Sequence, residues 1–306
     1  CMDDKGNMIL KELKTVFLNE LNGLYDIEEI ENFFYMLTHY YLQLNRLTIA
    51  LNPDKYLPVQ DLKPLTDALK DLKKNIPIQY ILGETEFFGL PFKVNKKVLI
   101  PRPETEELVD WILNTEFVKS NIELNILDIG TGSGCIAISL AKNLPNSNVY
   151  ALDVSEQALK IAKANAVLNK VFINTIHANI LDVEIWNDDI KNLEFDVIVS
   201  NPPYVRKLEQ EQMRGNVLNH EPHLALFVDN DDALQFYRAI AEYAQKYLKP
   251  NGFLFFEINE YLGNEMKQLL KDYNFNSIEL KQDIFGKDRM IKAINNYESH
   301  ISFLWK

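Results

Sequence analysis

Strand and helix patterns alternate along the chain from about residue 122 onward, and this alternation restricts the fold more than any other feature. Short apolar runs predict strands at 126–129, 149–152, 172–176, 195–200, 253–258, 278–280 and 290–294. Helical patterns are predicted between them at 136–144, 156–168, 233–248 and 261–271. This order is typical of a mostly parallel sheet with helices on both faces. We therefore expect an α/β fold.

The N-terminal part has a different pattern. Apolar residues at helical spacing predict a helix over 28–47, an interruption over 59–64, and a further helix over 65–72. The aromatic residues of this stripe are expected to pack in a core. Residues 78–94 contain glycine and proline between apolar residues, which predicts extended segments and a β-hairpin. We expect a helical bundle over 1–77, a linking hairpin over 78–100 and the α/β domain over 101–306.

Composition narrows the class of protein. The chain has 306 residues, 47% of them apolar and 25% charged, which is ordinary for a soluble globular protein. It has no apolar run long enough to span a membrane and no signal-peptide pattern before the first helix. Its two cysteines do not make a disulfide framework, which favours a reducing cytoplasm. A net charge of -12 counts against a polynucleotide substrate and mildly favours a protein or small molecule.

A glycine-rich loop follows the first predicted strand of the α/β part. Asp128 and Ile129 precede the five loop residues, which are Gly130, Thr131, Gly132, Ser133 and Gly134. Glycines there allow a tight turn and the close approach of a ligand. The dinucleotide fingerprint needs a third glycine where this chain has Cys135, and the loop lacks the lysine of a P-loop.

The second predicted strand ends at Asp153, whose carboxylate can accept both ribose hydroxyls of a nucleoside. S-adenosylmethionine fits this set, because it is a nucleoside with an amino-acid tail and no phosphate. For Asp128 two interpretations remain open. It holds the ammonium group of the ligand through water or backbone groups, or it is a structural carboxylate that faces the helix.

A diproline corner, Asn201-Pro202-Pro203-Tyr204, follows the predicted strand 195–200. Two consecutive prolines exclude helix and ladder, so they fix an extended turn at the strand end. The Asn201 oxygen and the Pro202 carbonyl can accept both hydrogens of an NH2 group, and Tyr204 can stack on its plane. We expect these residues to bind and activate an amide or amino nitrogen.

Other polar groups are assigned structural roles. His220, Glu221 and His223 lack a metal-site spacing and are expected to be solvated loop residues, so no metal is predicted. The glutamates at 104, 106 and 107 are expected to favour a helix N-terminus whose first residue is Pro103, and the acidic run 229–232 to cap the start of another helix. For Arg102 two alternatives stay open: a contact with substrate or cofactor, or a structural ion pair.

Taken together, the chain resembles the peptide-chain release factor glutamine methyltransferases. The resemblance runs from about Ile78 onward and is carried by five segments: Gln79–Gly83, Ile100–Glu106, Asp128–Gly134, Asn201–Tyr204 and Gly286–Arg289. It implies a class I, Rossmann-like methyltransferase sheet of seven strands with the last strand antiparallel. It also implies S-adenosylmethionine as the cofactor, and a release factor as the protein substrate.

The resemblance assigns roles residue by residue. Gly130 to Gly134 would contact the methionine part of the cofactor, Asp153 the ribose, and Asn179 or Trp186 the adenine. Asn201 would also lie at the cofactor. Asn201, Pro202, Pro203 and Tyr204 would bind the glutamine of a Gly-Gly-Gln loop, with Asn201, Pro202 and Tyr204 as the catalytic residues. The helices of 1–77 would help to dock the release factor.

Two other functions were compared with this one. A nucleic-acid base methyltransferase could use the same corner to hold a flipped adenine or guanine, but the acidic charge and the Pro101–Glu106 segment count against it. A non-catalytic adaptor on translation factors is disfavoured by the complete loop, Asp153 and corner. We expect a cytoplasmic monomer that binds neither nucleic acid nor membrane directly.

Overall fold

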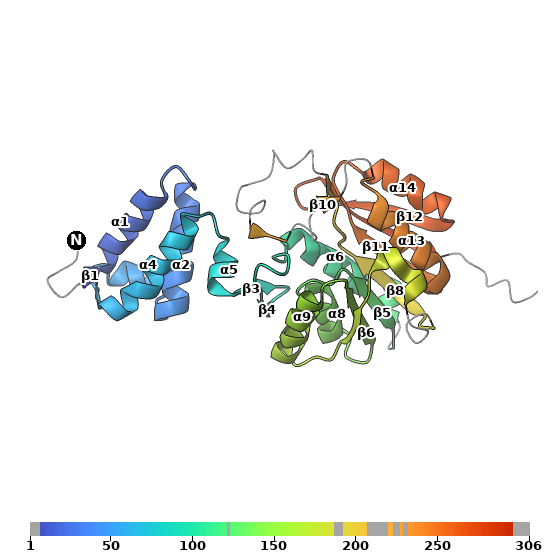
Figure 1. Cartoon of the computed structure of the whole chain (residues 1–306), viewed down its shortest axis with the longest axis horizontal. Helices are drawn as coiled ribbons and strands as arrows, with labels where there is room; N and C mark the ends of the chain where they lie inside the picture. Colours follow the sequence, from blue (N-terminus) through green and yellow to red (C-terminus); the bar gives the residue numbers. More distant parts are fainter. Residues whose placement is uncertain are drawn as a thin grey trace, which may run out of the picture. The chain divides into compact units, whose positions relative to one another are not determined.

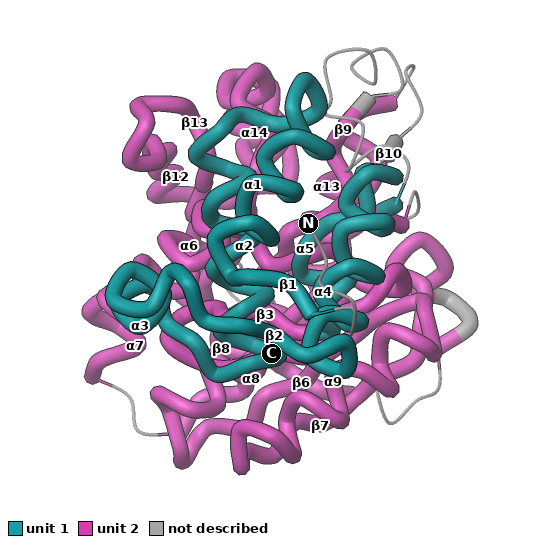
Figure 2. The backbone as a smooth tube through the Cα atoms, turned by 90° about the vertical axis from the view of Figure 1, so that its left-hand side faces the viewer, with its two compact units in different colours: residues 1–83, 214–220 teal, residues 84–213, 221–306 magenta. Residues whose placement is uncertain are grey.

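The computed structural model describes residues 7–120, 123–186, 192–206, 220–222, 227–228 and 232–295. The chain forms two compact units, one of residues 1–83 and 214–220 and the other of residues 84–213 and 221–306 (Figure 2). Of the residues singled out in the sequence, His223 and 229–231 lie outside the described ranges. No helix within those ranges is both long enough and apolar enough to cross a bilayer.

The first unit is a helical bundle (Figure 1). Its elements are β1 Met8–Ile9, α1 Leu10–Leu21, α2 Ile27–Leu42, α3 Arg46–Leu51, β2 Tyr56–Leu57, α4 Val59–Leu72 and α5 Ile78–Leu82. The predicted aromatic stripe lies in its core, where Phe33 and Phe34 are buried and Phe34 packs edge-on against Phe17. The structural interpretation of that stripe is therefore confirmed.

Three secondary-structure predictions for this part were wrong. The helix predicted over 28–47 ends at Leu42, because Gln43 adopts a left-handed conformation, and a second helix starts after Asn45, which accepts the Thr48 amide. The predicted interruption at 59–64 is helical, since α4 includes Pro64 within a run of buried leucines. Residues 78–82, predicted as extended, form a short helix that ends at Gly83 with φ +73°.

The second unit contains a sheet of seven strands in the order β12-β13-β11-β8-β5-β6-β7. These strands are β5 Asn125–Ile129, β6 Asn148–Asp153, β7 Asn174–His177, β8 Phe195–Ser200, β11 Leu248–Glu257, β12 Phe275–Gln282 and β13 Asp288–Asn295. Strands β11, β8, β5, β6 and β7 are mutually parallel, whereas β13 is antiparallel to both of its neighbours. The predicted α/β sheet, with its antiparallel last strand, is confirmed.

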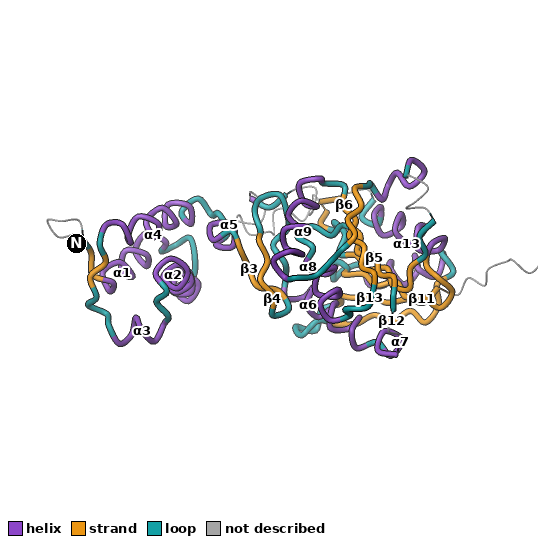
Figure 3. The backbone as a smooth tube through the Cα atoms, turned by 90° about the horizontal axis from the view of Figure 1, so that it is seen from below, coloured by secondary structure: helices purple, strands orange, loops and turns teal. Residues whose placement is uncertain are grey.

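Helices cover both faces of this sheet (Figure 3). They are α6 Pro103–Asn114, α7 Glu116–Ser120, α8 Cys135–Asn143, α9 Glu156–Asn169, η1 Ile180–Ile185, α13 Gln235–Tyr247 and α14 Gly263–Asp272. Alternate residues of each strand enter separate cores, as the pleat requires. Phe255 packs with α6 and α8, whereas Leu254 and Phe256 pack with α13 and α14. The described part also has the predicted hairpin, β3 Glu84–Phe87 with β4 Leu90–Lys93, and a short pair, β9 Val205–Arg206 with β10 Phe227–Val228.

The order of strands places a topological switch point between β5 and β8. The chain runs from β5 outward through β6 and β7, then returns to β8 on the other side of β5. Ligands bind at such a switch point, outside the carboxyl ends of parallel strands. Ile129 is paired with Ser200, so the glycine loop and the diproline corner begin at adjacent positions. The fold therefore places both predicted site segments at one switch point of the sheet.

Candidate active site

Four polar side chains stand at the carboxyl ends of neighbouring parallel strands. Asp128 and Asp153 belong to β5 and β6, Asn201 follows β8, and Glu257 ends β11. Both aspartates and the glutamate are buried, and Asn201 is half-buried. Buried polar groups at one edge of a sheet need partners, and these partners define two halves of the site.

The glycine loop forms the first half, and its shape depends on backbone conformations that favour glycine. Gly130, Gly132 and Gly134 have φ values of +76°, +55° and +83°. The amides of Gly130 and Thr131 both donate to the Leu152 carbonyl, at 2.8 and 3.0 Å. The Gly132 amide donates to Asp153 at 2.9 Å. The loop is thus fastened to the end of the next strand.

Gly134 has a packing role, whereas Gly130 and Gly132 leave the backbone accessible. A Cβ at Gly134 would lie 2.9 Å from Ile138 Cδ1 and 3.1 Å from Ala162 Cβ, so this glycine lets α8 and α9 pack closely. A Cβ at Gly130 would meet no described atom within 4 Å, and one at Gly132 only the Gly130 oxygen, at 4.0 Å. This stretch of backbone is open to a ligand, as a cofactor loop requires.

Asp153 links the loop to the next helix. One carboxylate oxygen accepts the Gly132 amide and the other accepts the Ser155 amide at 2.8 Å. Ser155 in turn caps α9 as predicted, by accepting the Ala158 amide. Burial raises the pKa of Asp153. Each oxygen keeps a second lone pair, so the carboxylate can still accept the two hydroxyls of a ribose.

Asp128 is buried below the loop. Its Oδ2 accepts the Thr131 hydroxyl at 2.6 Å and the Ala137 amide at 3.3 Å. Its Oδ1 has no hydrogen-bond partner among the described residues, and burial raises the pKa of the carboxyl to about 7. The first oxygen has a structural role, and the second suits a cationic group such as the ammonium of an amino acid.

The diproline corner forms the second half of the site. Asn201 Nδ2 donates to Thr105 Oγ1 at 3.3 Å, and the Tyr204 hydroxyl donates to Glu257 Oε1 at 3.2 Å. Pro202 is buried and Pro203 half-buried. The corner borders a cavity of about 50 Å³, which is lined by Leu99, Arg102, Asn201, Pro202, Tyr204, Val205 and Glu257. A cavity of this kind suits one small polar group.

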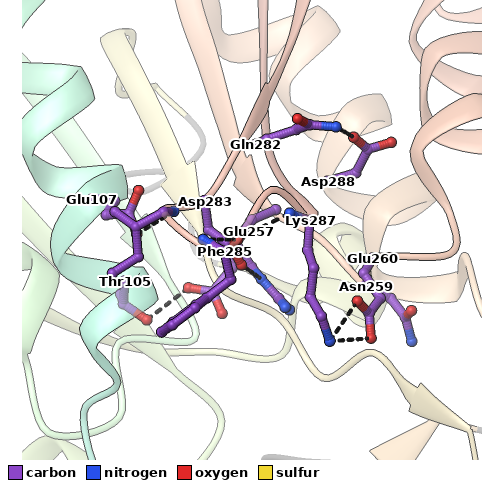
Figure 4. A network of polar contacts seen from close by, with 12 residues as sticks. Thr105, Glu107, Glu257, Asn259, Glu260, Gln282, Asp283, Phe285, Lys287 and Asp288 are labelled. Carbon is purple, nitrogen blue, oxygen red and sulfur yellow. Dashed lines mark hydrogen bonds and ion pairs between the residues drawn. The ribbon is translucent and has the colours of Figure 1, made fainter.

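Sequence analysis did not predict two residues that contact the diproline corner, Thr105 and Glu257. Thr105 is buried in the first turn of α6, and its hydroxyl donates to Glu257 Oε2 at 2.6 Å (Figure 4). Glu257 therefore holds Thr105 with one oxygen and Tyr204 with the other. One signal could have found it, since Glu257 is a lone carboxylate at the end of an apolar strand, on the same edge as Asp128 and Asp153.

The antiparallel strand β13 brings a cation to this end of the sheet. Arg289 Nε lies 3.1 Å from Asp283 Oδ2, and Asp283 also accepts the amides of Phe285 and Lys287 (Figure 4). Burial raises the pKa of Glu257, while the Thr105 hydroxyl and the Arg289 charge oppose the rise. Burial and the Glu257 charge raise the pKa of Tyr204, which stays a neutral donor.

The residues around Arg102 require one correction. Glu221 was predicted to be solvated, but its side chain is 1% exposed. Its Oε1 lies 2.5 Å from Arg102 Nη2, and its Oε2 accepts the Ile100 amide at 3.3 Å. The partner lies 119 positions away, which no local pattern reveals. For Arg102 the structural ion pair is confirmed, and the guanidinium also borders the cavity.

The glutamates of α6 act as structural acceptors. Glu106 accepts the Phe88 amide at 2.8 Å, and Glu107 accepts the Ile284 amide at 3.2 Å (Figure 4). His220 is also partnered, because its Nε2 lies 2.9 Å from the Lys74 carbonyl oxygen within the first unit. Among the described residues, no group of three or more histidine, cysteine, aspartate or glutamate side chains could hold a metal ion.

Asn179 and Trp186, the two residues predicted to contact adenine, interact with each other. The Trp186 indole donates to the Asn179 carbonyl at 2.9 Å, while its ring is buried and packs on Tyr243. The Asn179 side chain accepts the Leu181 amide and donates to Asp182. Trp186 thus supports the loop that carries Asn179, and an adenine contact stays a prediction for both.

Comparisons with known proteins agree with this geometry. Residues 111–224 match the family described as Methyltransferase small domain, and residues 18–83 match the PrmC N-terminal domain. A release factor glutamine methyltransferase of Flavobacterium psychrophilum is 55% identical over 287 residues, which cover 94% of this chain and 99% of that protein. One of Bacteroides thetaiotaomicron is 43% identical and covers 89% and 95%.

Among solved structures, the fold resembles one described as the delta-N METTL16 MTase domain. The TM-score is 0.51 at 18% identity, with 76% of this chain and 99% of that one covered. The methyl donor of the fold, S-adenosylmethionine, fits the open loop, the spare lone pairs of Asp153 and the unpartnered oxygen of Asp128. The family resemblance seen in the sequence is confirmed: this chain belongs to the release factor glutamine methyltransferases.

Proposed function

We propose that this chain methylates the side-chain amide nitrogen of the glutamine in the Gly-Gly-Gln motif of peptide-chain release factors. Family membership supports the enzyme class. The observation that supports this substrate is the small cavity at the diproline corner, which is lined by Asn201 and Pro202. These residues follow β8, which pairs with β5, the strand that bears the cofactor loop. A primary carboxamide offers two donors for the acceptor oxygens of Asn201 and Pro202.

The corner would act by orienting the nitrogen. When bound, S-adenosylmethionine supplies a methyl group on a positively charged sulfur. The Asn201 oxygen and the Pro202 carbonyl would each accept one N–H of the substrate amide, which turns the nitrogen lone pair toward the cofactor loop. Fixed acceptors also stabilise the positive charge that grows on nitrogen during the attack. Tyr204, held by Glu257, would pack against the amide plane.

No strong base is required for this transfer. Held at the glycine loop and Asp153, S-adenosylmethionine would supply the methyl carbon with its sulfur as the leaving group, and the amide nitrogen would lose one proton to solvent. Placing the two reactants in line is worth several kcal/mol, on the order of 7–11 for the best-oriented reactions. In this proposal the chain supplies position, acceptors and a small cavity.

We also assign the parts of the chain. Residues 1–77 would dock the release factor, residues 78–100 would link the two parts, and residues 101–306 would transfer the methyl group. The match of residues 18–83 to the PrmC N-terminal domain supports a role specific to this family. The methyltransferase part alone shares its fold with enzymes of other substrates.

The test is a methylation assay with the site of the mark identified. The protein is incubated with S-adenosylmethionine and a release factor, and the peptides are mapped by mass spectrometry. We expect one methyl group on the motif glutamine and none on a release factor in which that glutamine is replaced by asparagine. Methylation of added DNA or RNA, with an unmodified glutamine, would show a nucleic-acid methyltransferase in its place.

A further inference from the structure

Asn201 has an amide side chain that can face its cavity in two ways. With its oxygen toward the substrate it accepts an N–H, and with its NH2 group toward the substrate it sets one donor against another. The proposed function works only with the first orientation. The contacts of Thr105 bear on this choice.

The Thr105 hydroxyl lies between two partners. It is 2.6 Å from Glu257 Oε2 and 3.3 Å from Asn201 Nδ2, and both Thr105 and Glu257 are buried. An ionised carboxylate can only accept, so the one hydrogen of the hydroxyl is donated to Glu257. Toward Asn201 the hydroxyl then has lone pairs alone, and the amide must present its NH2 group to Thr105.

Glu257 is placed to accept from Thr105, because two hydrogen-bond donors and one cation oppose the rise in its pKa that burial causes. Its other oxygen accepts the Tyr204 hydroxyl, and the Arg289 guanidinium contributes a positive charge. Thr105 is anchored by α6, whose neighbouring Glu106 fastens the helix to the Phe88 amide. The hydroxyl is therefore fixed in place by a helix on one side and by a carboxylate on the other.

We infer that Thr105 is a positioning residue, which through its hydrogen bond to Glu257 turns the Asn201 amide so that its oxygen faces the substrate nitrogen. Thr105 itself touches neither substrate nor cofactor in this account. Without the hydroxyl, the Asn201 amide would lose its fixed orientation, and the productive arrangement would form only part of the time. This inference rests on the proposed function and extends it.

The inference is tested by three variants in a single-turnover assay of methyl transfer to a release factor. Thr105→Val keeps the shape of the side chain and removes the hydroxyl, so we expect the rate constant to fall about tenfold to a hundredfold. Thr105→Ser restores the hydroxyl and should stay within about threefold of the wild type. The affinity for S-adenosylmethionine, measured by calorimetry, should not change in either variant.

Thr115→Val is the matched control. Thr115 follows the same helix and its hydroxyl donates to the Trp111 carbonyl, so its loss should leave the rate unchanged. A Thr105→Val rate equal to that of the wild type, or a Thr105→Ser rate as low as that of Thr105→Val, would overturn the inference alone. No glutamine methylation by the wild type would overturn the proposed function as well.

A measurement on the wild type covers the case in which Thr105→Val does not fold. Neutron diffraction from a deuterated crystal locates the two amide deuterons of Asn201. We expect them on the nitrogen that faces Thr105, with the oxygen toward the cavity. Deuterons directed into the cavity would contradict the inference without any substitution.

Discussion

The two halves of the site are built by different kinds of contact. In the first half, called here the cofactor half because it contains the glycine loop, Thr131 is hydrogen-bonded to Asp128 three positions away and Gly132 to Asp153 twenty-one positions away. In the second half, called the acceptor half because it contains the diproline corner, Thr105 is hydrogen-bonded to Asn201, 96 positions away, and to Glu257, 152 positions away. The first half is formed by local backbone geometry, whereas the second exists only when the whole sheet has assembled.

The two kinds of contact predict different effects of substitution. The cofactor half relies on glycine backbone and close helix packing, so changes there should lower stability or cofactor binding. The acceptor half relies on oriented polar side chains around a small cavity, so changes there should lower the rate of the chemical step. The following substitutions test that division, beginning with the largest expected effect.

Asn201→Ala should separate the halves most clearly. Loss of the amide removes an acceptor that acts on the reacting nitrogen, so the single-turnover rate should fall about 10²–10³-fold. Affinity for S-adenosylmethionine should change far less. Asn114→Ala, which removes an exposed amide on α6, is the control and should be silent. A nearly normal rate for Asn201→Ala would contradict the role of the acceptor half.

Gly134→Ala should act on stability. The alanine must keep a backbone φ of +83°, and its methyl group lies within 3.1 Å of Ile138 and Ala162 atoms. We therefore expect a loss of about 2–4 kcal/mol in the free energy of unfolding. Gly89→Ala has φ +70° with no described atom within 4 Å, and it should cost about 1–2 kcal/mol. Urea unfolding compares the two, and equal losses would show that helix packing adds nothing at Gly134.

Arg102→Met tests the ion pair beside the cavity. It leaves the Glu221 carboxylate buried without its cation, which should cost about 2 kcal/mol, a value reduced by the partial exposure of Arg102. Adding Glu221→Gln should restore part of that loss. Lys160→Met, at an exposed pair with Glu156, should change the unfolding free energy by less than about 0.5 kcal/mol. Equal effects at both pairs would mean that burial of Glu221 does not matter.

Asp128→Asn tests the buried carboxyl by its pH dependence. The folded pKa of about 7 is above the ordinary value of 3.8, so wild-type stability is fully present below pH 4 and declines as pH rises toward 7. The asparagine variant avoids this decline, and without cofactor it should gain at least about 1 kcal/mol relative to the wild type between pH 4 and pH 8. Thermal unfolding at both pH values measures the gain; an equal difference at both would rule out the raised pKa.

The same division explains what the sequence could predict. The strand 195–200, the glycine loop, the Ser155 cap and the Pro103 helix start depend on neighbours in the chain, and all four are confirmed. Glu221 was misjudged, and Thr105 and Glu257 were missed, because their partners are 53 to 152 positions away. The helix over 59–72 was divided because the penalty of Pro64 is visible in the sequence, while its offset by buried leucines is not.

The two halves are expected to form one site, and binding of a bisubstrate ligand is the decisive test. Such a ligand carries a nitrogen in place of the cofactor sulfur and joins it to a glutamine amide nitrogen through two methylene groups. Calorimetry should show tighter binding than for either half alone, because the second contact becomes intramolecular, and Asn201→Ala should remove the gain. Affinity equal to that of the nucleoside part alone, and unchanged in Asn201→Ala, would contradict the account.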